Sequence, residues 1–282
     1  MTSDGQLEGL VEDLIARTER VSCADNRLSL PSSSNESPSL QPTLIGKILS
    51  PRNFYDTVVA DILQKAWRPA KPFHIKKMDR NIFAFSFEHE TDQSLAFNRR
   101  PWTFRGAHLV LKRWNPILTS QEIDFNSSTF WVQVHGLPAF WQRKDYISWI
   151  GGKVGTVVEV DFVGEPRIQW QRFVRIRVDI DLASPLSPGF FLPRDNHQDL
   201  WMDLKYERLP GICYWCGVIG HDTRDCVRDE KMLRNEFGLL FSAYGHWIRM
   251  ENVESPPGIY ARPPCNATEA ILAPPHLTRD LD

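Results

Sequence analysis

Three cysteines and one histidine with the spacing of metal ligands lie within fourteen residues of one another. Two residues separate Cys213 from Cys216, four separate Cys216 from His221, and four more separate His221 from Cys226. Three thiolates and one imidazole in so short a stretch suit the tetrahedral coordination of Zn²⁺. A stretch of this length has no hydrophobic core of its own, so we expect one zinc ion, bound in the same event that folds the loop.

Two glycines between these ligands favour the same interpretation. Gly217 and Gly220 let the chain fold back closely and point backbone amides at the thiolates, which holds metal ligands in place. The alternatives are cysteines placed by chance or a disulfide pair in a secreted domain. Four ligands in register with both glycines present argue against these alternatives.

Apolar and basic side chains surround the four predicted ligands. The apolar ones, against which unstacked bases can lie, are Tyr214, Trp215 and Ile219. The basic ones, candidates for phosphate contacts, are Arg224, Arg228 and Lys231. One stacked base is worth about 1–3 kcal/mol, whereas association costs about 4–15 kcal/mol, so this loop needs help from another surface. Packing of Tyr214 and Trp215 against a neighbouring domain remains the alternative.

The pattern Cys-x2-Cys-x4-His-x4-Cys, with an aromatic residue after the first cysteine and a glycine after the second, resembles the CCHC zinc knuckle. Arg224 and Asp225 before the last cysteine fit the resemblance as well. Asp222 departs from it, because retroviral knuckles usually carry an apolar residue there, which weakens the inferred base pocket. The resemblance implies binding of single-stranded nucleic acid.

The charge of the chain is nearly balanced overall but not locally. Its 282 residues leave room for two domains or one large one, and the net charge of −2 creates no global field that attracts nucleic acid. Residues 66–115 contain ten Lys or Arg residues against four acidic ones. The candidates for phosphate contacts in this run are Arg99, Arg100, Arg105, Lys112 and Arg113. A solvated charged face is the alternative.

The hydrophobic pattern of the same region predicts an α+β fold with the order β-α-β-β-α-β. The predicted strands and helices are, in order, residues 44–49, 54–67, 73–77, 82–87, 91–99 and 102–114. This is the order of ferredoxin-like folds, which RNA-recognition domains share. Phe83, Phe85 and Phe87 alternate along one strand and are interpreted as a core face. We therefore expect the scaffold without the usual base-stacking platform.

Composition divides the chain further. The predicted parts are an amphipathic helix (1–21), a disordered linker (22–41), the ferredoxin-like domain (42–115), a second α+β unit (116–204), the zinc-binding segment (205–230), a C-terminal helix (231–249) and a disordered tail (250–282). The apolar stripe of the first helix either docks on the body of the protein or pairs with a second copy.

A second resemblance covers residues 42–249. The segments that carry it are Leu44-Ile-Gly-Lys-Ile-Leu-Ser-Pro51, Ala66-Trp67, Pro101-Trp-Thr-Phe-Arg-Gly106, Leu111-Lys-Arg-Trp114 and Phe130-Trp-Val-Gln-Val-His-Gly-Leu-Pro138. They are similar to a plant domain of unknown function that commonly precedes a CCHC knuckle in retrotransposon-derived, gag-like proteins. The resemblance implies nucleic-acid binding and supplies no catalytic residues.

Motifs that would indicate catalysis are missing from the sequence. It contains no phosphate-binding loop of the Gly-x4-Gly-Lys-Ser/Thr type, no Gly-x-Ser-x-Gly and no His-Glu-x-x-His, so we expect no enzyme activity. Thiolate ligands and the lack of a signal peptide or membrane-spanning run predict an intracellular protein, nuclear or cytoplasmic. The expected partner is single-stranded RNA or DNA, with no membrane and no small-molecule substrate. The alternative is a protein-interaction adaptor in which the zinc ion only stabilises the fold.

Overall fold

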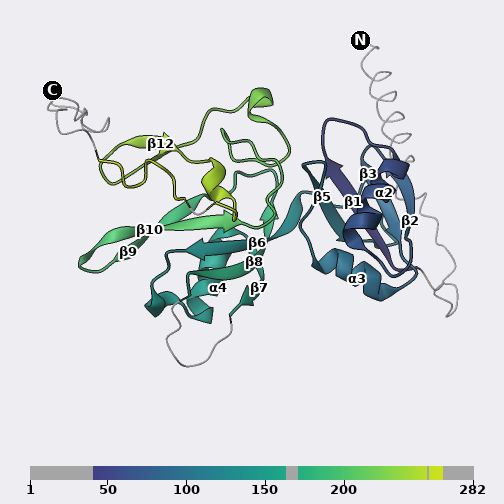
Figure 1. Ribbon diagram of the computed structural model, residues 1–282, viewed down its shortest axis with the longest axis horizontal. Helices are drawn as coiled ribbons and strands as arrows, with labels where there is room; N and C mark the ends of the chain where they lie inside the picture. Colours follow the sequence, from purple (N-terminus) through teal and green to yellow (C-terminus); the bar gives the residue numbers. More distant parts are fainter. Residues whose placement is uncertain (1–40, 163–170, 253, 263–282) are drawn as a thin grey trace, which may run out of the picture. The chain divides into compact units, whose positions relative to one another are not determined.

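The computed structural model describes residues 41–162, 171–252 and 254–262 of the chain (Figure 1). Within these residues it contains two five-stranded antiparallel sheets and one two-stranded sheet, together with a few helices. The predicted α+β class is confirmed. The predicted N-terminal helix, and the linker up to residue 40, lie outside the described residues.

The first sheet is built from the first half of the described chain. Its elements are β1 (Thr43–Leu49), α2 (Asp56–Trp67), β2 (His74–Asp79), β3 (Ile82–Ser86), α3 (Glu90–Asn98), β4 (Trp102–Phe104) and β5 (Ala107–Arg113). The strands lie in the order β2-β3-β1-β5-β4. The predicted order β-α-β-β-α-β is present, and its last strand is a hairpin of β4 and β5.

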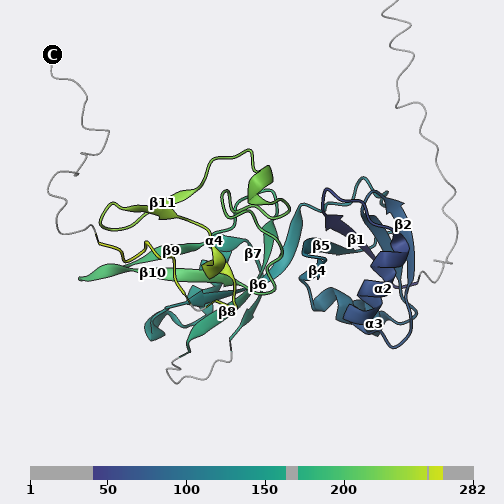
Figure 2. The ribbon, with the colours of Figure 1, turned by 45° about the horizontal axis from the view of Figure 1, so that its top comes forward.

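One face of this sheet packs against its two helices (Figures 1 and 2). The side chains of Phe83 and Phe85 are 0% exposed and that of Phe87 is 1% exposed. They share a core cluster with residues from both helices, and the Trp67 and Phe85 ring centroids are 5.0 Å apart. Alternation places these phenylalanines on one side of the strand, and their interpretation as a core face is confirmed.

The opposite face of the first sheet is covered as well. Ile45 and Val110 are buried in the same cluster as Phe130, which belongs to the second sheet. His108 is 1% exposed, and its ring stacks on that of Phe130 with the centroids 5.1 Å apart. Neither face therefore offers a free row of aromatic side chains for bases.

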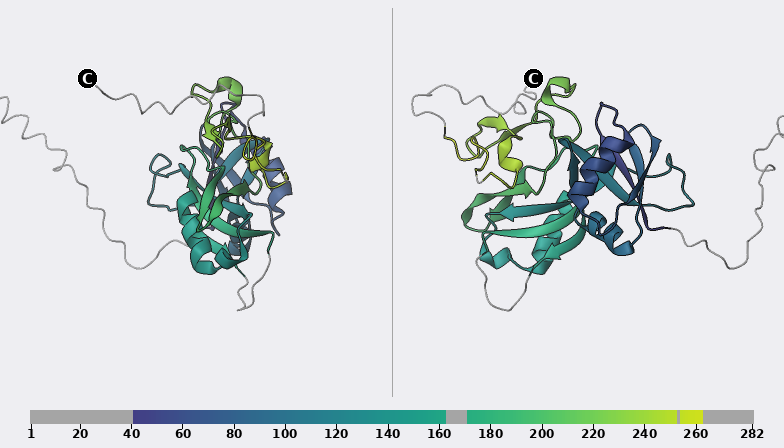
Figure 3. Two further views of the ribbon diagram at one scale, coloured as in Figure 1. Left: turned by 90° about the vertical axis from the view of Figure 1, so that its left-hand side faces the viewer. Right: turned by 45° about the vertical axis from the view of Figure 1, so that its right-hand side comes forward.

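The second sheet repeats the strand order of the first. Its elements are β6 (Ser127–His135), α4 (Lys144–Val154), β7 (Thr156–Asp161), β8 (Phe173–Asp181), β9 (Gly189–Arg194) and β10 (His197–Tyr206). The order β7-β8-β6-β10-β9 matches that of the first sheet strand for strand. Helix α4 packs Ile147 and Ile150 on one face of this sheet (Figure 3). The second unit has no counterpart of α3: residues 182–188 connect β8 to β9 without a helix, and the strand β9, the counterpart of β4, was not predicted from the sequence. Pro193 is tolerated there because β9 is an edge strand.

The predicted helix over residues 231–249 is wrong. This segment forms a hairpin of β11 (Met232–Arg234) and β12 (Leu240–Ser242), followed by a 3-10 helix (His246–Ile248). The Asn235 side chain accepts hydrogen bonds from the backbone N–H groups of Phe237 and Leu239, and Gly238 has φ +80°. Local turn chemistry thus overrides the helical spacing of the apolar residues.

Part of the predicted disordered tail (250–282) is folded, and residues 263–282 lie outside the described residues. Ile259 is 2% exposed and lies in a core cluster with Trp201 and Phe241. The Asn235 amide donates hydrogen bonds to the carbonyl oxygens of Gly258 and Ala261. Residues 254–262 therefore belong to the folded part. None of the helices in the described ranges is long and apolar enough to cross a membrane.

Candidate metal centre and nucleic-acid interface

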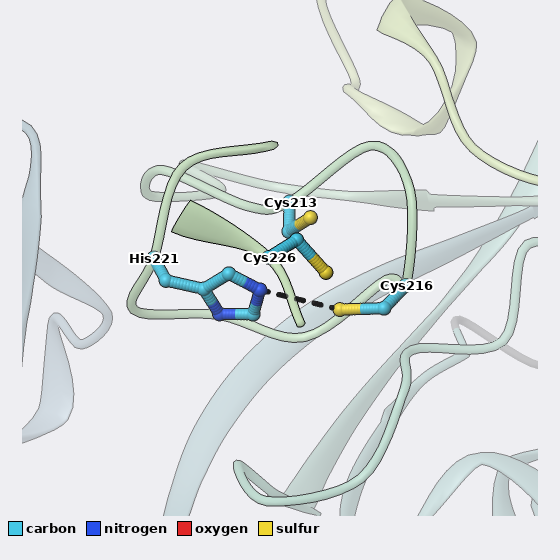
Figure 4. Close-up of side chains that lie close together, drawn as sticks. All are labelled: Cys213, Cys216, His221 and Cys226. Atoms are coloured by element: carbon cyan, nitrogen blue, oxygen red, sulfur yellow. Dashed lines mark hydrogen bonds between the residues drawn. The ribbon is translucent and has the colours of Figure 1, made fainter. Parts of the chain in front are cut away.

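The four predicted metal ligands converge on one point (Figure 4). The ligand atoms of Cys213, Cys216, His221 and Cys226 all lie within 4.8 Å of one another. The Cys216 Sγ and His221 Nε2 atoms are 3.4 Å apart. Zn–S and Zn–N bonds of about 2.3 and 2.0–2.1 Å at tetrahedral angles put sulfur and nitrogen about 3.6 Å apart, and two sulfurs about 3.8 Å apart. The four residues therefore fit a tetrahedral zinc ion.

Backbone hydrogen bonds shape the Cys/His loop, residues 213–226. Ile212 and Ile219 form an antiparallel bridge, and the Cys213 N–H donates to the Val218 carbonyl at 3.0 Å. The Gly217 N–H donates to the Cys213 carbonyl at 2.9 Å, which closes a turn in which Gly217 has φ +77°. Glycine adopts this left-handed conformation without steric cost, so the residue type here sets the approach of the first two cysteines.

The first two thiols have pKa values shifted in opposite directions. Burial raises the pKa of Cys216 to about 11. Burial also acts on Cys213, but the backbone N–H groups of Cys216 and Trp215 outweigh it and lower the pKa of that thiol. Amides directed at a sulfur stabilise the thiolate, the form that binds metal.

Residues downstream of the loop hold it against the body of the protein. The Arg249 guanidinium donates hydrogen bonds to the carbonyl oxygens of Leu209 and Pro210, at 2.5 and 3.0 Å, and to the Tyr214 hydroxyl at 3.0 Å. Tyr244 is 2% exposed, lies against Gly217 and donates from its hydroxyl to the Leu186 carbonyl at 2.7 Å. The loop is therefore docked on the second sheet and its C-terminal hairpin.

The apolar residues predicted to meet bases have different environments. Trp215 is 43% exposed. Tyr214 is half-buried, with its ring centroid 5.1 Å from that of His246, and its hydroxyl accepts from Arg249. Ile219 is 6% exposed and packs in the main core. Of the three, only Trp215 presents a large free face, and the alternative of packing applies to Tyr214.

The three basic residues predicted around the loop are exposed. The Arg224 side chain is 94% exposed and lies 3.9 Å from an Asp222 oxygen. Arg228 is exposed, and Lys231 donates from its backbone N–H to the Trp215 carbonyl. Their charges are available to solvent, but acidic neighbours offset them.

The five basic residues predicted from the charge run do not form one surface. The Arg100 guanidinium lies 3.4 Å over the Phe97 ring and donates to the Leu111 carbonyl, and burial lowers its pKa to about 10. Lys112 donates to the Ser127 hydroxyl, and Arg113 donates to the Gln93 side-chain oxygen. Arg100 and Arg113 are thus held within the first unit, and Lys112 is held by β6 of the second sheet.

The other two members of the run, Arg99 and Arg105, are exposed. They line separate hollows of the surface. Sequence reasoning missed Arg249 and Tyr244, which support the Cys/His loop from residues far along the chain. No local spacing signals such contacts, since they depend on the folding of the C-terminal hairpin.

Two family models match parts of the chain. Residues 37–122 match a model described as a domain of unknown function, DUF4283, and residues 193–228 match a model described as a zinc knuckle. No curated protein matches the chain.

Among solved structures, the chain is similar to a Sex-lethal protein in complex with RNA. The two are 19% identical, the match covers 49% of this chain and 81% of that chain, and the TM-score is 0.23. It is also similar to RNA recognition domains 1 and 2 of Sex-lethal from Drosophila melanogaster, with 19% identity, 49% and 85% covered, and a TM-score of 0.22. The chain thus combines a DUF4283 domain with a CCHC-type zinc knuckle that follows it.

Proposed function

We propose that the chain is a zinc-dependent protein that binds single-stranded RNA or DNA, of retrotransposon gag-like origin, without enzyme activity of its own. It acts inside the cell. Zinc supplies the fold of the Cys/His loop, and the loop presents Trp215 to an unstacked base. Because the whole chain is nearly neutral, the binding depends on the residues at the binding surface and not on the net charge of the protein.

The geometry of the four ligands carries the proposal. Their convergence within 4.8 Å fixes a loop on which Trp215 stays 43% exposed, although tryptophan is ordinarily among the well-buried residues. Hydrogen bonds of Arg249 and Tyr244 hold this loop on the body of the protein, so the indole is presented on a rigid support. A rigid aromatic platform loses little conformational entropy when a base stacks on it.

The test is fluorescence anisotropy with a labelled single strand and the zinc-loaded protein, before and after a chelator. Trp215→Ala is expected to weaken binding by about 1–3 kcal/mol, roughly 5- to 150-fold, the worth of one stacked base. Trp149→Ala is the matched control, because Trp149 is a 64% exposed tryptophan on α4. Binding that survives zinc removal, or equal losses in both variants, would contradict the proposal.

A second candidate function, protein-interaction adaptor, is favoured by an aromatic patch on the second unit. Phe140, Tyr146 and Trp149 are 70%, 36% and 64% exposed, beside an apolar hollow of about 400 Å³. Grouped exposed aromatic side chains are typical of protein interfaces. For an adaptor we expect no salt-sensitive nucleic-acid binding by the zinc-loaded chain, and loss of partner binding in Trp149→Ala with Trp215→Ala unaffected.

A further inference from the structure

A basic groove lies on the first unit, away from the metal ligands. It has a volume of about 670 Å³ and is lined by residues from the C-terminal end of α2, the segment from the end of α3 into β4, and the chain just after β10. Its charged lining residues are all cationic: Lys65, Arg68, Arg99 and Arg208. They come from three places in the sequence, and two of them lie outside the basic run of residues 66–115.

Three of the four cations of the groove have no ion-pair partner among the described residues. No ion pair within 4 Å involves Lys65, Arg68 or Arg99 in that part of the chain, and all three are exposed. Glu207, the neighbour of Arg208 in sequence, is bound to the Arg175 guanidinium through both its oxygens, each at 2.7 Å. The Glu207 carboxylate is thereby hydrogen-bonded to an arginine outside the groove.

The positions of Lys65, Arg68 and Arg99 at helix ends do not account for all of this charge. Arg68 is the C-cap of α2 and Arg99 that of α3, where cations offset the helix dipole. Each helix end carries about half a negative charge, so two ends neutralise about one of the four cations. A net charge of about +3 is left at the groove, enough to attract several phosphates.

An aromatic ring is fixed inside the groove among these cations. The Trp102 indole N–H donates to the Ala96 carbonyl at 2.7 Å, which locks the ring, and the Arg208 guanidinium lies 5.9 Å from the ring centroid. Arg208 also donates to the Arg99 carbonyl at 3.0 Å. Cations that follow a backbone, combined with an aromatic face, are the arrangement used for single-stranded nucleic acid.

The groove has the net positive charge that the Cys/His loop lacks. Around the loop, three basic side chains are opposed by four acidic ones, namely Asp222, Asp225, Asp229 and Glu230. The loop therefore offers a base-stacking face without a net positive charge. Arg208 precedes Cys213 by five residues, so their Cα atoms are at most about 18 Å apart. A strand of a few nucleotides is long enough to touch both.

We propose that the groove of Lys65, Arg68, Arg99, Arg208 and Trp102 binds the phosphodiester backbone of the same single strand whose base stacks on Trp215. The inference rests on the proposed function and assigns the second surface that a single zinc-binding loop requires. Phosphates lie on the four cations, and Trp102 contacts a sugar or base between them.

The test is the salt dependence of binding to an oligouridine of about 16 nucleotides, the upper end of single-strand site sizes. Each phosphate contact contributes about 0.7 to the slope of log K against log salt, so Lys65→Gln/Arg68→Gln/Arg99→Gln is expected to reduce the slope by about 2. At about 0.1 M salt the same variant should bind on the order of 100-fold more weakly.

The matched control neutralises three exposed lysines elsewhere on the surface: Lys76→Gln/Lys144→Gln/Lys153→Gln. It removes the same net charge, so equal slopes in the two triple variants would overturn the groove while leaving the proposed function intact. Zinc content and thermal melting should be unchanged in both, because none of the three groove side chains donates a hydrogen bond to a described residue.

Photocrosslinking of a thiouridine-containing strand localises the contact directly. An adduct on the peptide that contains Trp102 supports the groove, and adducts confined to residues 213–231 would overturn it. Failure of the zinc-loaded wild type to bind any single strand would remove the proposed function and the groove together. Binding that depends on the groove but not on zinc or Trp215 would leave the groove standing and reject the role of the loop.

Discussion

Replacement of Gly217 by alanine tests how the Cys/His loop is held. Gly217 has φ +77°, and a Cβ atom on it would lie 2.1 Å from a carbon of the Tyr244 ring. The ring has no room to withdraw, because Tyr244 is 2% exposed and its hydroxyl is bonded to the Leu186 carbonyl. Gly217→Ala must therefore distort the turn between the first two cysteines or displace the loop from its support.

The expected loss combines two effects. An L-residue in the left-handed region costs about 1–2 kcal/mol, and overpacking of a close contact typically costs about 1–3 kcal/mol. Together they amount to about 2–5 kcal/mol. Because loop folding and metal binding are coupled, this loss should be expressed in zinc affinity, as a decrease of roughly 30-fold to several thousand-fold.

Competition with a fluorescent zinc chelator measures this decrease, and Gly238→Ala is the matched control. Gly238 has φ +80°, but its Cβ would find its nearest neighbour, an Arg234 nitrogen, 3.8 Å away. The control should lose only the about 1–2 kcal/mol of backbone strain, in thermal stability and not in zinc affinity. If both variants bind zinc equally well, the close contact between Gly217 and Tyr244 does not support the zinc-binding loop, and the reasoning is refuted.

Two further predictions concern groups outside the metal centre. Burial lowers the pKa of His108 to about 4, below its ordinary 6.5, so its contribution to stability is complete above pH 6.5 and is lost as pH falls towards 4. Between pH 7 and 4.5, wild type should lose about 2 kcal/mol more in urea unfolding than His108→Leu; equal losses would contradict this. Arg249→Ala should lower the free energy of unfolding of the zinc-loaded protein by about 1.5–3 kcal/mol, the worth of a hydrogen bond to a charged group. The exposed Arg228→Ala should lose almost nothing, and a similar loss in both would show that Arg249 does not hold the loop.

The sequence predicts those features whose signals are local. The spacing of Cys213, Cys216, His221 and Cys226 specifies a ligand set because all four lie in one loop. The order of the first unit follows from strand and helix periodicities over short windows. Residues 231–249 were mispredicted because apolar spacing there resembles a helix, whereas the Asn235 side chain and Gly238 determine a tight turn. Side-chain hydrogen bonds to nearby backbone compete with helix formation.

Surface charge is the property that the linear pattern predicts least well. Arg100, Lys112 and Arg113 contribute to the basic run, yet their hydrogen bonds to Leu111, Ser127 and Gln93 tie them to the fold. Arg208, which lies more than ninety residues downstream of the run, donates to the Arg99 carbonyl and completes a groove that the run alone does not form. A count of charges along the chain measures proximity in sequence, whereas a phosphate responds to proximity in space and to whether each cation already has a partner. In this chain, proximity in sequence and proximity in space select different sets of arginines, which have only Arg99 in common. If the nucleic acid follows the linear run of charges, Arg105→Gln should weaken its binding most. If it follows the groove, Lys65→Gln or Arg68→Gln should weaken its binding, and Arg105→Gln should have almost no effect. These single substitutions therefore decide between the two surfaces.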